Sequence, residues 1–166
     1  MLLPLLFLVG CAEENPTKIT IDMINQEEES IGTVQLQEQA SGVKLSFDLH
    51  DLPSGEHALH IHDKADCKGP DFKSAGKHFN PEEKEHGLLH PKGSHAGDLP
   101  NLIVEGDGKI KTEIMAPSVT MLEGKNMLFS KEGTAIVIHE DKDDGMCQPD
   151  GESGGGIACG KIKKDE

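Results

Sequence analysis

Histidines are concentrated in one part of this chain of 166 residues. Seven of the nine lie between His57 and Asp98. His60 and His62 are two residues apart, and on a β-strand this spacing points both side chains to the same face. Imidazole is a ligand that suits copper and zinc, so two imidazoles on one face are a ready pair of metal ligands.

More potential ligands follow in a glycine- and proline-rich stretch with little apolar patterning. They are His78, His86, His95 and Asp98. A long polar segment must be ordered by something other than a hydrophobic core, and a metal ion can do this. The single carboxylate among the imidazoles suits zinc. The stretch is therefore predicted to be a metal-binding loop.

The composition limits both the core and the partners of this protein. Hydrophobic residues make up 35% of the chain and aromatic residues 3%, so the core must be aliphatic. The 19 glycines favour many turns over long helices. The net charge is −14 and every basic residue is a lysine. This balance disfavours nucleic-acid binding, which needs clustered positive charge.

Alternation of apolar and polar residues predicts an all-β fold. Eight short strands are expected at 18–26, 30–38, 42–50, 57–62, 101–107, 109–117, 134–140 and 156–162. Gly32 lies inside the second of these and predicts a bulge. The segment Glu105–Gly108 has the composition of a hairpin turn. The expected architecture is one domain, an eight-stranded antiparallel Greek-key barrel or sandwich with long metal-binding loops.

The N-terminus has the pattern of an export signal. Residues 1–10 are an apolar run, too short to span a bilayer as a helix, that ends at Cys11. Leu8 to Cys11 resembles the lipobox of bacterial lipoproteins, which predicts a signal peptide at 1–10, a lipidated cysteine and tether at 11–17, and the folded domain at 18–166. The alternative is an ordinary signal peptide with an incidental cysteine. The lipobox predicts an exported, extracytoplasmic protein anchored to the bacterial cell membrane as a lipoprotein.

Five segments resemble the signature blocks of the copper/zinc superoxide dismutases. Their sequences are most similar to those of the bacterial periplasmic or lipoprotein branch. They are GEHALHIHDKADC, KHFNPEEKEHG, GSHAGDLPN, AIVIHEDKDD and SGGGIACG. The resemblance covers residues 18–163. It implies copper and zinc as cofactors, superoxide as substrate, and dismutation to oxygen and hydrogen peroxide.

The resemblance also implies a role for each matching residue. The copper ligands, which are also the catalytic residues, match His60, His62, His78 and His139. The zinc ligands match His78, His86, His95 and Asp98, so that His78 bridges the two metals. Asp143 matches an aspartate that hydrogen-bonds one histidine of each site, and His57 matches a histidine that ties loops together. Cys67 and Cys159 match the family's disulfide pair.

One departure from the family pattern bears on activity. The family carries an arginine three residues before the second disulfide cysteine, and this chain has Gly156 there. The segment between His139 and Gly156 contains six acidic residues and only one lysine, Lys142. We therefore predict a dismutase with a reduced rate. The alternative is a copper/zinc-binding protein with little or no dismutase activity, acting in metal storage or buffering.

The remaining histidines and the unmatched cysteine receive simpler interpretations. His50 and His90 match no ligand position and are predicted to be surface residues. Cys147 is interpreted as an incidental loop thiol, with a redox or metal-binding role as the alternative.

Overall fold

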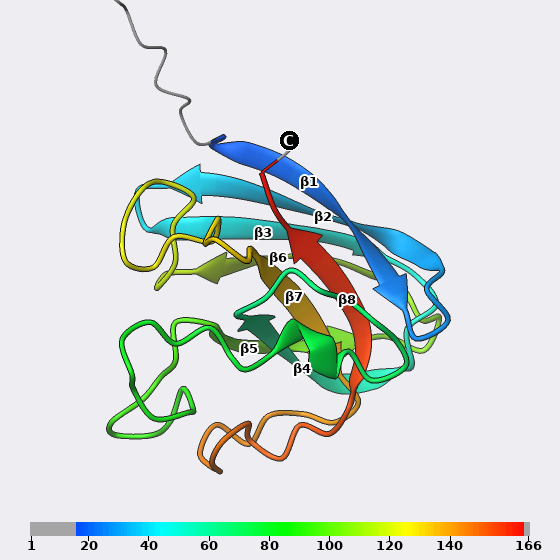
Figure 1. Ribbon diagram of the computed structural model, residues 1–166. Coiled ribbons are helices and arrows are strands. Elements are labelled where there is room, and N and C mark those ends of the chain that lie inside the picture. The colour runs from blue at the N-terminus through cyan, green and yellow to red at the C-terminus, as the bar shows by residue number, and fades with distance from the viewer. Residues whose placement is uncertain (1–15, 165–166) are drawn as a thin grey trace, which may run out of the picture.

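The computed structural model describes residues 16–164, which form an eight-stranded antiparallel β-barrel (Figure 1). The strands are β1 (Lys18–Asn25), β2 (Ser30–Gln39), β3 (Gly42–Leu49), β4 (Gly55–His62), β5 (Asp98–Val104), β6 (Ile110–Ala116), β7 (Thr134–His139) and β8 (Gly156–Ile162). Within this part of the chain the one helix is a 3-10 turn, η1 (Lys73–Ala75). The strand order β5-β4-β7-β8-β1-β2-β3-β6 leaves the barrel nearly closed. The predicted all-β class and eight strands are confirmed.

The predicted hairpin at Glu105–Gly108 is wrong. The turn itself forms, because the amide of Gly108 donates to the carbonyl of Glu105 at 3.0 Å. The strands on its two sides do not pair, since β5 pairs with β4 and β6 pairs with β3. Turn residues fix the reversal of the chain but not the strand partners, which depend on where each apolar face is buried. This turn joins the two edge strands at the seam of the barrel.

The bulge predicted at Gly32 is confirmed. Met23 of β1 lies opposite Gly32, but Ile24 lies opposite Ser30, so the register shifts by one residue there. Gly32 has φ +119°, and a Cβ atom on it would lie 2.2 Å from the carbonyl oxygen of Asp48. Only glycine fits this conformation and this close approach.

Strands β4 and β7 are buried on both faces, which explains their nearly continuous apolar sequences. On the inner face, residues such as Leu59 and Ile136 belong to the aliphatic core of the barrel. On the outer face, Val137 packs in a second, smaller cluster beneath the loop that follows β4. His60, His62 and His139 alternate with the core residues of these strands and therefore share this outer face.

A disulfide between Cys67 and Cys159 joins that loop to β8. The disulfide lies in the smaller cluster. Besides Cys67, the loop contributes the buried residues Phe72 and Ala75 to this cluster. The bond closes a loop of 92 residues. In the chain-entropy model such a closure stabilises the fold by roughly 4–5 kcal/mol. The predicted pairing is confirmed, and it holds the first part of the metal-binding loop against the barrel.

The predicted signal segment at 1–10 and Cys11 lie outside the described residues. Among residues 16–164, no helix combines the length and the hydropathy needed to cross a bilayer.

Candidate metal centre

Two neighbouring strands supply three of the predicted copper ligands. His60 and His62 stand on the outer face of β4, and His139 is the last residue of β7. The strands pair so that His60 lies opposite Val137. All three histidines are buried. The ladder thus fixes three imidazoles on one rigid surface.

The loop after β4 adds His78 to this surface. His62 and His78 form an isolated β-bridge, and the amide of Phe79 donates to the carbonyl of Ile61 at 2.7 Å. The rings of His60 and His78 lie 3.9 Å apart between centroids. Backbone hydrogen bonding to β4 therefore positions a ligand that comes from a segment without strands of its own.

The first group of potential ligands matches the predicted copper set. Its members offer atoms that all lie within 4.8 Å of one another: His60, His62, His78 and His139. Nε2 of His62 and Nε2 of His139 are 3.3 Å apart.

Hydrogen bonds set the tautomers of these rings so that one nitrogen of each is left free. Nε2 of His60 donates to Asp143 at 2.8 Å, and Nδ1 of His62 donates to the carbonyl of Gly76 at 3.1 Å. Nδ1 of His139 is 3.2 Å from the carbonyl of Gly154. The remaining nitrogens have lone pairs, as metal ligands require. Nδ1 of His60 is buried without a hydrogen-bond partner, as expected of an atom that faces a metal.

Burial also keeps these imidazoles neutral. Desolvation lowers the pKa of His60 to about 3 and the pKa of His139 to about 4. The pKa of His62 is likewise well below its usual value, mainly because the ring is buried. Neutral imidazole is the form that binds a metal ion, so the group is ready for one at neutral pH.

A second group surrounds Asp98, the first residue of β5. Its Oδ1 atom lies 3.0 Å from Nδ1 of His78, 3.1 Å from Nδ1 of His86 and 3.3 Å from Nδ1 of His95. Ligand atoms around a tetrahedral zinc ion with bonds of about 2.0–2.1 Å lie about 3.3 Å apart. The spacing around Asp98 therefore suits zinc. The other oxygen, Oδ2, accepts the amides of Gly87 and His95, each at 2.9 Å.

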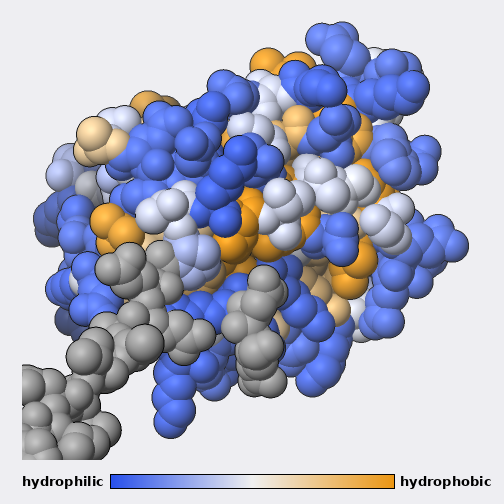
Figure 2. Space-filling view, turned by 90° about the horizontal axis from the view of Figure 1, so that it is seen from above, coloured by the Kyte–Doolittle hydropathy of each residue, from blue (hydrophilic) through white to orange (hydrophobic). Residues whose placement is uncertain are grey.

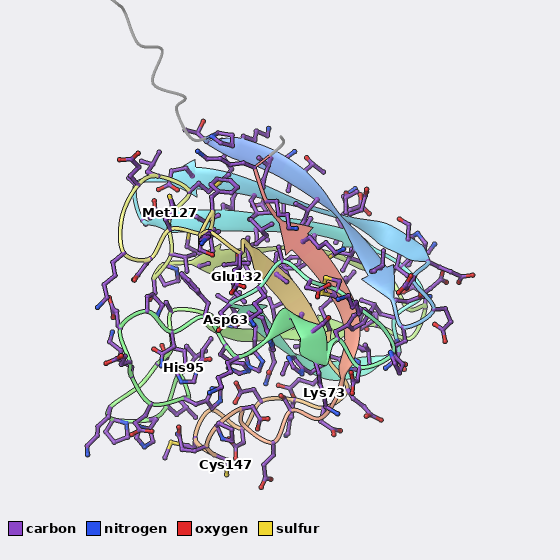
Figure 3. All side chains as sticks on the ribbon, viewed as in Figure 1. Asp63, Lys73, His95, Met127, Glu132 and Cys147 are labelled. Carbon is purple, nitrogen blue, oxygen red and sulfur yellow. A yellow bond between two sulfur atoms is a disulfide. The ribbon has the colours of Figure 1, made fainter. Side chains whose placement is uncertain are left out.

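His95 completes this group less tightly than the other three residues. Its Nδ1 lies 3.4 Å from Nδ1 of His78. However, His95 is not among the four residues here whose potential ligand atoms all lie within 4.8 Å of one another, and His60 is the fourth member instead. They are His60, His78, His86 and Asp98. His95 is part-exposed and comes from the polar loop, where Figure 3 shows it below the barrel. Nδ1 of His86 is buried and close to Oδ1 of Asp98, but the geometry makes no hydrogen bond between them.

Asp143 connects the two groups, as the resemblance implies. One oxygen accepts Nε2 of His60 at 2.8 Å and the other lies 3.0 Å from Nε2 of His86. Burial lowers the pKa of His86, but the carboxylates of Asp143 and Asp98 beside the ring outweigh this and raise it to about 9. The pKa values of both carboxyl groups are held well below the usual range despite burial, because the histidines stabilise their charged forms. The two carboxylates thus stabilise the protonated ring of His86. A metal ion bound to the ring would take the place of one proton.

His57 ties the loop after β7 to the barrel. Its Nδ1 lies 2.9 Å from the carbonyl oxygens of both His139 and Glu140, and its Nε2 lies 3.0 Å from that of Pro53. The ring belongs to neither group, in agreement with the framework role that the resemblance implies.

A cleft of about 520 Å³ opens onto the first group, and Gly156 lines it together with His62, His78 and His139. Lys73 and Lys77 also line the cleft. Sequence reasoning missed these two lysines. They come from the disulfide-bearing loop rather than from the segment before β8, and the sequence DFKSAGK has no signal that places them at the mouth.

The charges at this mouth nearly balance. Lys73 is paired with Asp71, at 2.7 Å between Nζ and Oδ2. Lys77 forms no ion pair within the described chain and shares the cleft with Asp150. The mouth is therefore less acidic than the sequence between His139 and Gly156 suggests.

Cys147, on the exposed loop between β7 and β8, is a free thiol. A hydrogen bond with Asp144 raises its pKa to about 11, so it is protonated at neutral pH. Asp144, Cys147 and Glu152 lie close enough to hold an ion, but all three are exposed. The interpretation as an incidental thiol stays a prediction. His50 and His90 belong to none of the potential ligand groups in residues 16–164.

Residues 30–162 match the family described as copper/zinc superoxide dismutase (SODC). The chain belongs to the copper/zinc superoxide dismutase family. It is 44% identical over 160 residues to Superoxide dismutase [Cu-Zn] 2 of Aquifex aeolicus, covering 95% of this chain and 94% of that protein. It is 34% identical to the Superoxide dismutase [Cu-Zn] of Escherichia coli K12, and the match covers 92% of this chain and 91% of that protein. The predicted cofactors, copper and zinc, are confirmed at the level of the family and the histidine groups.

Solved structures of the copper/zinc superoxide dismutase fold superpose on the barrel. A double mutant of a SOD-like protein from Bacillus subtilis gives a TM-score of 0.85 at 39% identity, covering 87% of this chain and 96% of that one. The Cu/Zn superoxide dismutase of Brucella abortus gives 0.72 at 27% identity, with coverage of 88% and 99%. A disulfide and bacterial relatives of this family are typical of extracytoplasmic proteins.

The bridging carboxylate leads to a prediction about metal affinity. Asp143→Asn keeps one acceptor oxygen but loses the charge and the second acceptor, so His60 and His86 lose their common support. Loss of such an outer carboxylate typically costs about 10–100-fold in metal affinity. Chelator competition for zinc and copper measures this. Asp144→Asn, a neighbouring exposed change, is the matched control, and equal affinities in the two variants would contradict the prediction.

Proposed function

We propose that this protein is an exported copper/zinc superoxide dismutase that works at a reduced rate because Gly156 replaces the family's arginine. The reaction converts two superoxide anions and two protons to dioxygen and hydrogen peroxide. The observation that carries the proposal is a pair of adjoining buried ligand groups, which have His60 and His78 in common, with one group open to a cleft.

The ligand assignment follows the two groups. Copper is assigned to His60, His62, His78 and His139, and zinc to His78, His86, His95 and Asp98. When bound, copper supplies the reversible one-electron change that dismutation needs, and zinc supplies a fixed charge that orders the loop. Nδ1 of His60 is buried without a hydrogen-bond partner, and Nδ1 of His86 is buried 3.1 Å from Oδ1 of Asp98 without hydrogen-bond geometry, and both atoms support the assignment.

The chain's own residues have three tasks in this reaction. The barrel strands hold the rings of His60, His62 and His139 in place, so binding needs little rearrangement. His78 turns Nδ1 toward Asp98, so its Nε2 is the atom at which this ring can take up and release a proton for the peroxide. The cleft admits a small anion past Lys77 but offers no guanidinium to hold it.

The proposed cellular location is the outer side of a bacterial membrane. Cys11 would be lipidated after cleavage at Gly10, and Cys67–Cys159 would be oxidised after export. A single acyl chain binds membranes only marginally, so a stable anchor needs more than one chain.

The alternative is a copper/zinc-binding protein with little dismutase activity, used in metal storage or buffering. Gly156 favours it, and one relative, 34% identical, has the name superoxide dismutase-like protein in Bacillus subtilis.

Dismutation by the fully copper- and zinc-loaded protein, normalised to bound copper, tests the proposal. We expect activity that depends on copper and disappears when copper is removed while zinc stays bound. His50→Gln, which leaves both ligand groups unchanged, is the control for substitution of a histidine. A loaded protein without copper-dependent activity would favour the storage function.

A further inference from the structure

The side of the barrel where the described chain begins carries a groove that the metal centre does not use. Strands β1 and β8 pair only at Ile24–Cys159 and Asn25–Ala158 and separate beyond these pairs. Between them lies a cavity of about 650 Å³ with an apolar floor that includes Ile19, Ile21 and Ile24. Seen from this side, apolar surface lies open between hydrophilic residues (Figure 2).

The rim of the groove is basic, although the whole chain is acidic. Four of the 16 lysines line it: Lys18, Lys161, Lys163 and Lys164. All four are exposed, and none forms an ion pair with another residue of the described chain. Asp22 is the one acidic residue in the lining. A strongly acidic protein thus gathers unpaired positive charge around an apolar floor.

This groove shares no lining residue with the cleft of the metal centre. Pro16, where the described chain begins, lines the groove. In Figure 3 the labelled Lys73 and His95, which line that cleft, lie toward the bottom of the view, whereas β1 lies at the top. A partner bound at the groove would leave that cleft open.

We propose that the groove is a docking face for an anionic phospholipid bilayer, an inference that rests on the proposed lipidation of Cys11. Cys11 precedes Pro16 by five residues, which reach at most about 18 Å when fully extended. A lipid on Cys11 therefore holds this side of the barrel at the membrane surface. Lysines there meet lipid phosphates, and the part-exposed Ile19 and Ile24 offer apolar surface to the interface. The cleft of the metal centre, which has no residue in common with the groove, then stays open to the solvent from which superoxide arrives.

Vesicle binding tests this face without the anchor. Loaded protein comprising residues 11–166 with Cys11→Ser is sedimented with vesicles of phosphatidylglycerol and phosphatidylethanolamine, or of phosphatidylcholine alone. We expect binding to the anionic vesicles only, weakened by salt. Each lysine near an anionic surface is worth about fivefold in affinity, so replacing Lys161, Lys163 and Lys164 with Gln should weaken binding roughly 100-fold.

A matched control makes the same change of charge elsewhere. Lys109, Lys125 and Lys131 are exposed lysines outside the groove, and their replacement with Gln should change binding far less. Asp165 and Glu166, which follow the lysines, stay in every variant. Equal binding by the two triple variants, or no preference for anionic vesicles, would overturn the proposal. So would a dimer that the groove variant abolishes, because it would make a second copy of the chain the occupant.

The anchor is tested separately by membrane fractionation of cells that make either the wild-type full chain or its Cys11→Ser variant. Retention of the wild-type chain in the membrane fraction and release of the variant support lipidation. Unchanged retention of the variant would refute lipidation, and vesicle binding would still decide whether the groove binds lipid.

Discussion

Removal of zinc is expected to unfold residues 80–95 locally while the barrel stays intact. Only His86 and Gly87 are buried in this stretch, so almost no apolar contact holds it. Zinc sites in small domains contribute about 10 kcal/mol or more to folding. If even a third of this acts locally, amide protection in 80–95 should fall by at least roughly 10²-fold.

The structure shortens the segment that is expected to lose its order when zinc is removed. From the sequence, all of 67–98 is expected to depend on the metal. However, Cys67 is held by the disulfide, Phe72 packs in the smaller cluster, and Phe79 belongs to the main core. Residues 67–79 should therefore keep part of their protection without zinc.

Hydrogen exchange of zinc-loaded and zinc-free protein measures both effects in one experiment. Amides of β2 and β3, which pair along their whole length away from the metal centre, provide the internal control. If 80–95 exchanges equally fast with and without zinc, the stretch is ordered by something other than the metal.

The strands could be predicted because their signal is local. Alternation along a segment such as 42–50 records which face is buried, and the structure places β3 at Gly42–Leu49. The same logic put His60 and His62 on one face. The partners of β5 and β6 could not be predicted from their turn, because pairing depends on the closure of the whole barrel.

Most of the side chains that the structure brings together at the metal centre could be named from the sequence, but their surroundings could not. Clustered histidines have few roles other than metal binding, so their identities carried the prediction. His139 and Asp143 were found only through the resemblance, since a single histidine after an apolar strand and a single aspartate in an acidic loop have no distinguishing signal. Lys77 could not be found, because its place at the cleft depends on how the disulfide holds the loop.

Gly156→Arg is expected to raise the dismutation rate of the loaded protein by roughly tenfold or more. Steering by a positively charged cleft increases association rates by about 10–10³-fold. Gly156 lines the cleft with His62 and His139, so a guanidinium there would lie beside the path to the ligand group. Each tenfold gain corresponds to about 1.4 kcal/mol of transition-state stabilisation.

The backbone permits this substitution, but the surroundings are tight. Gly156 does not adopt the positive φ that would strain a side chain. An added Cβ would lie 3.0 Å from the carbonyl oxygen of Asp71, 3.1 Å from Val137 Cγ1 and 3.2 Å from Phe72 Cδ2. These neighbours must move by a few tenths of an ångström, so a loss of stability is expected. Gly156→Ala has the same Cβ without the charge and separates the two effects.

Salt dependence distinguishes guidance by charge from any other gain. Because Lys73 is paired with Asp71 and Lys77 shares the mouth with Asp150, the wild-type rate should change little with ionic strength. The Gly156→Arg rate should fall as salt is added, and the Gly156→Ala rate should follow the wild type. Copper occupancy is measured in all three proteins. If the arginine variant, equally loaded, gains no rate and no salt dependence, a missing arginine does not limit this protein, and the explanation offered for a reduced rate fails.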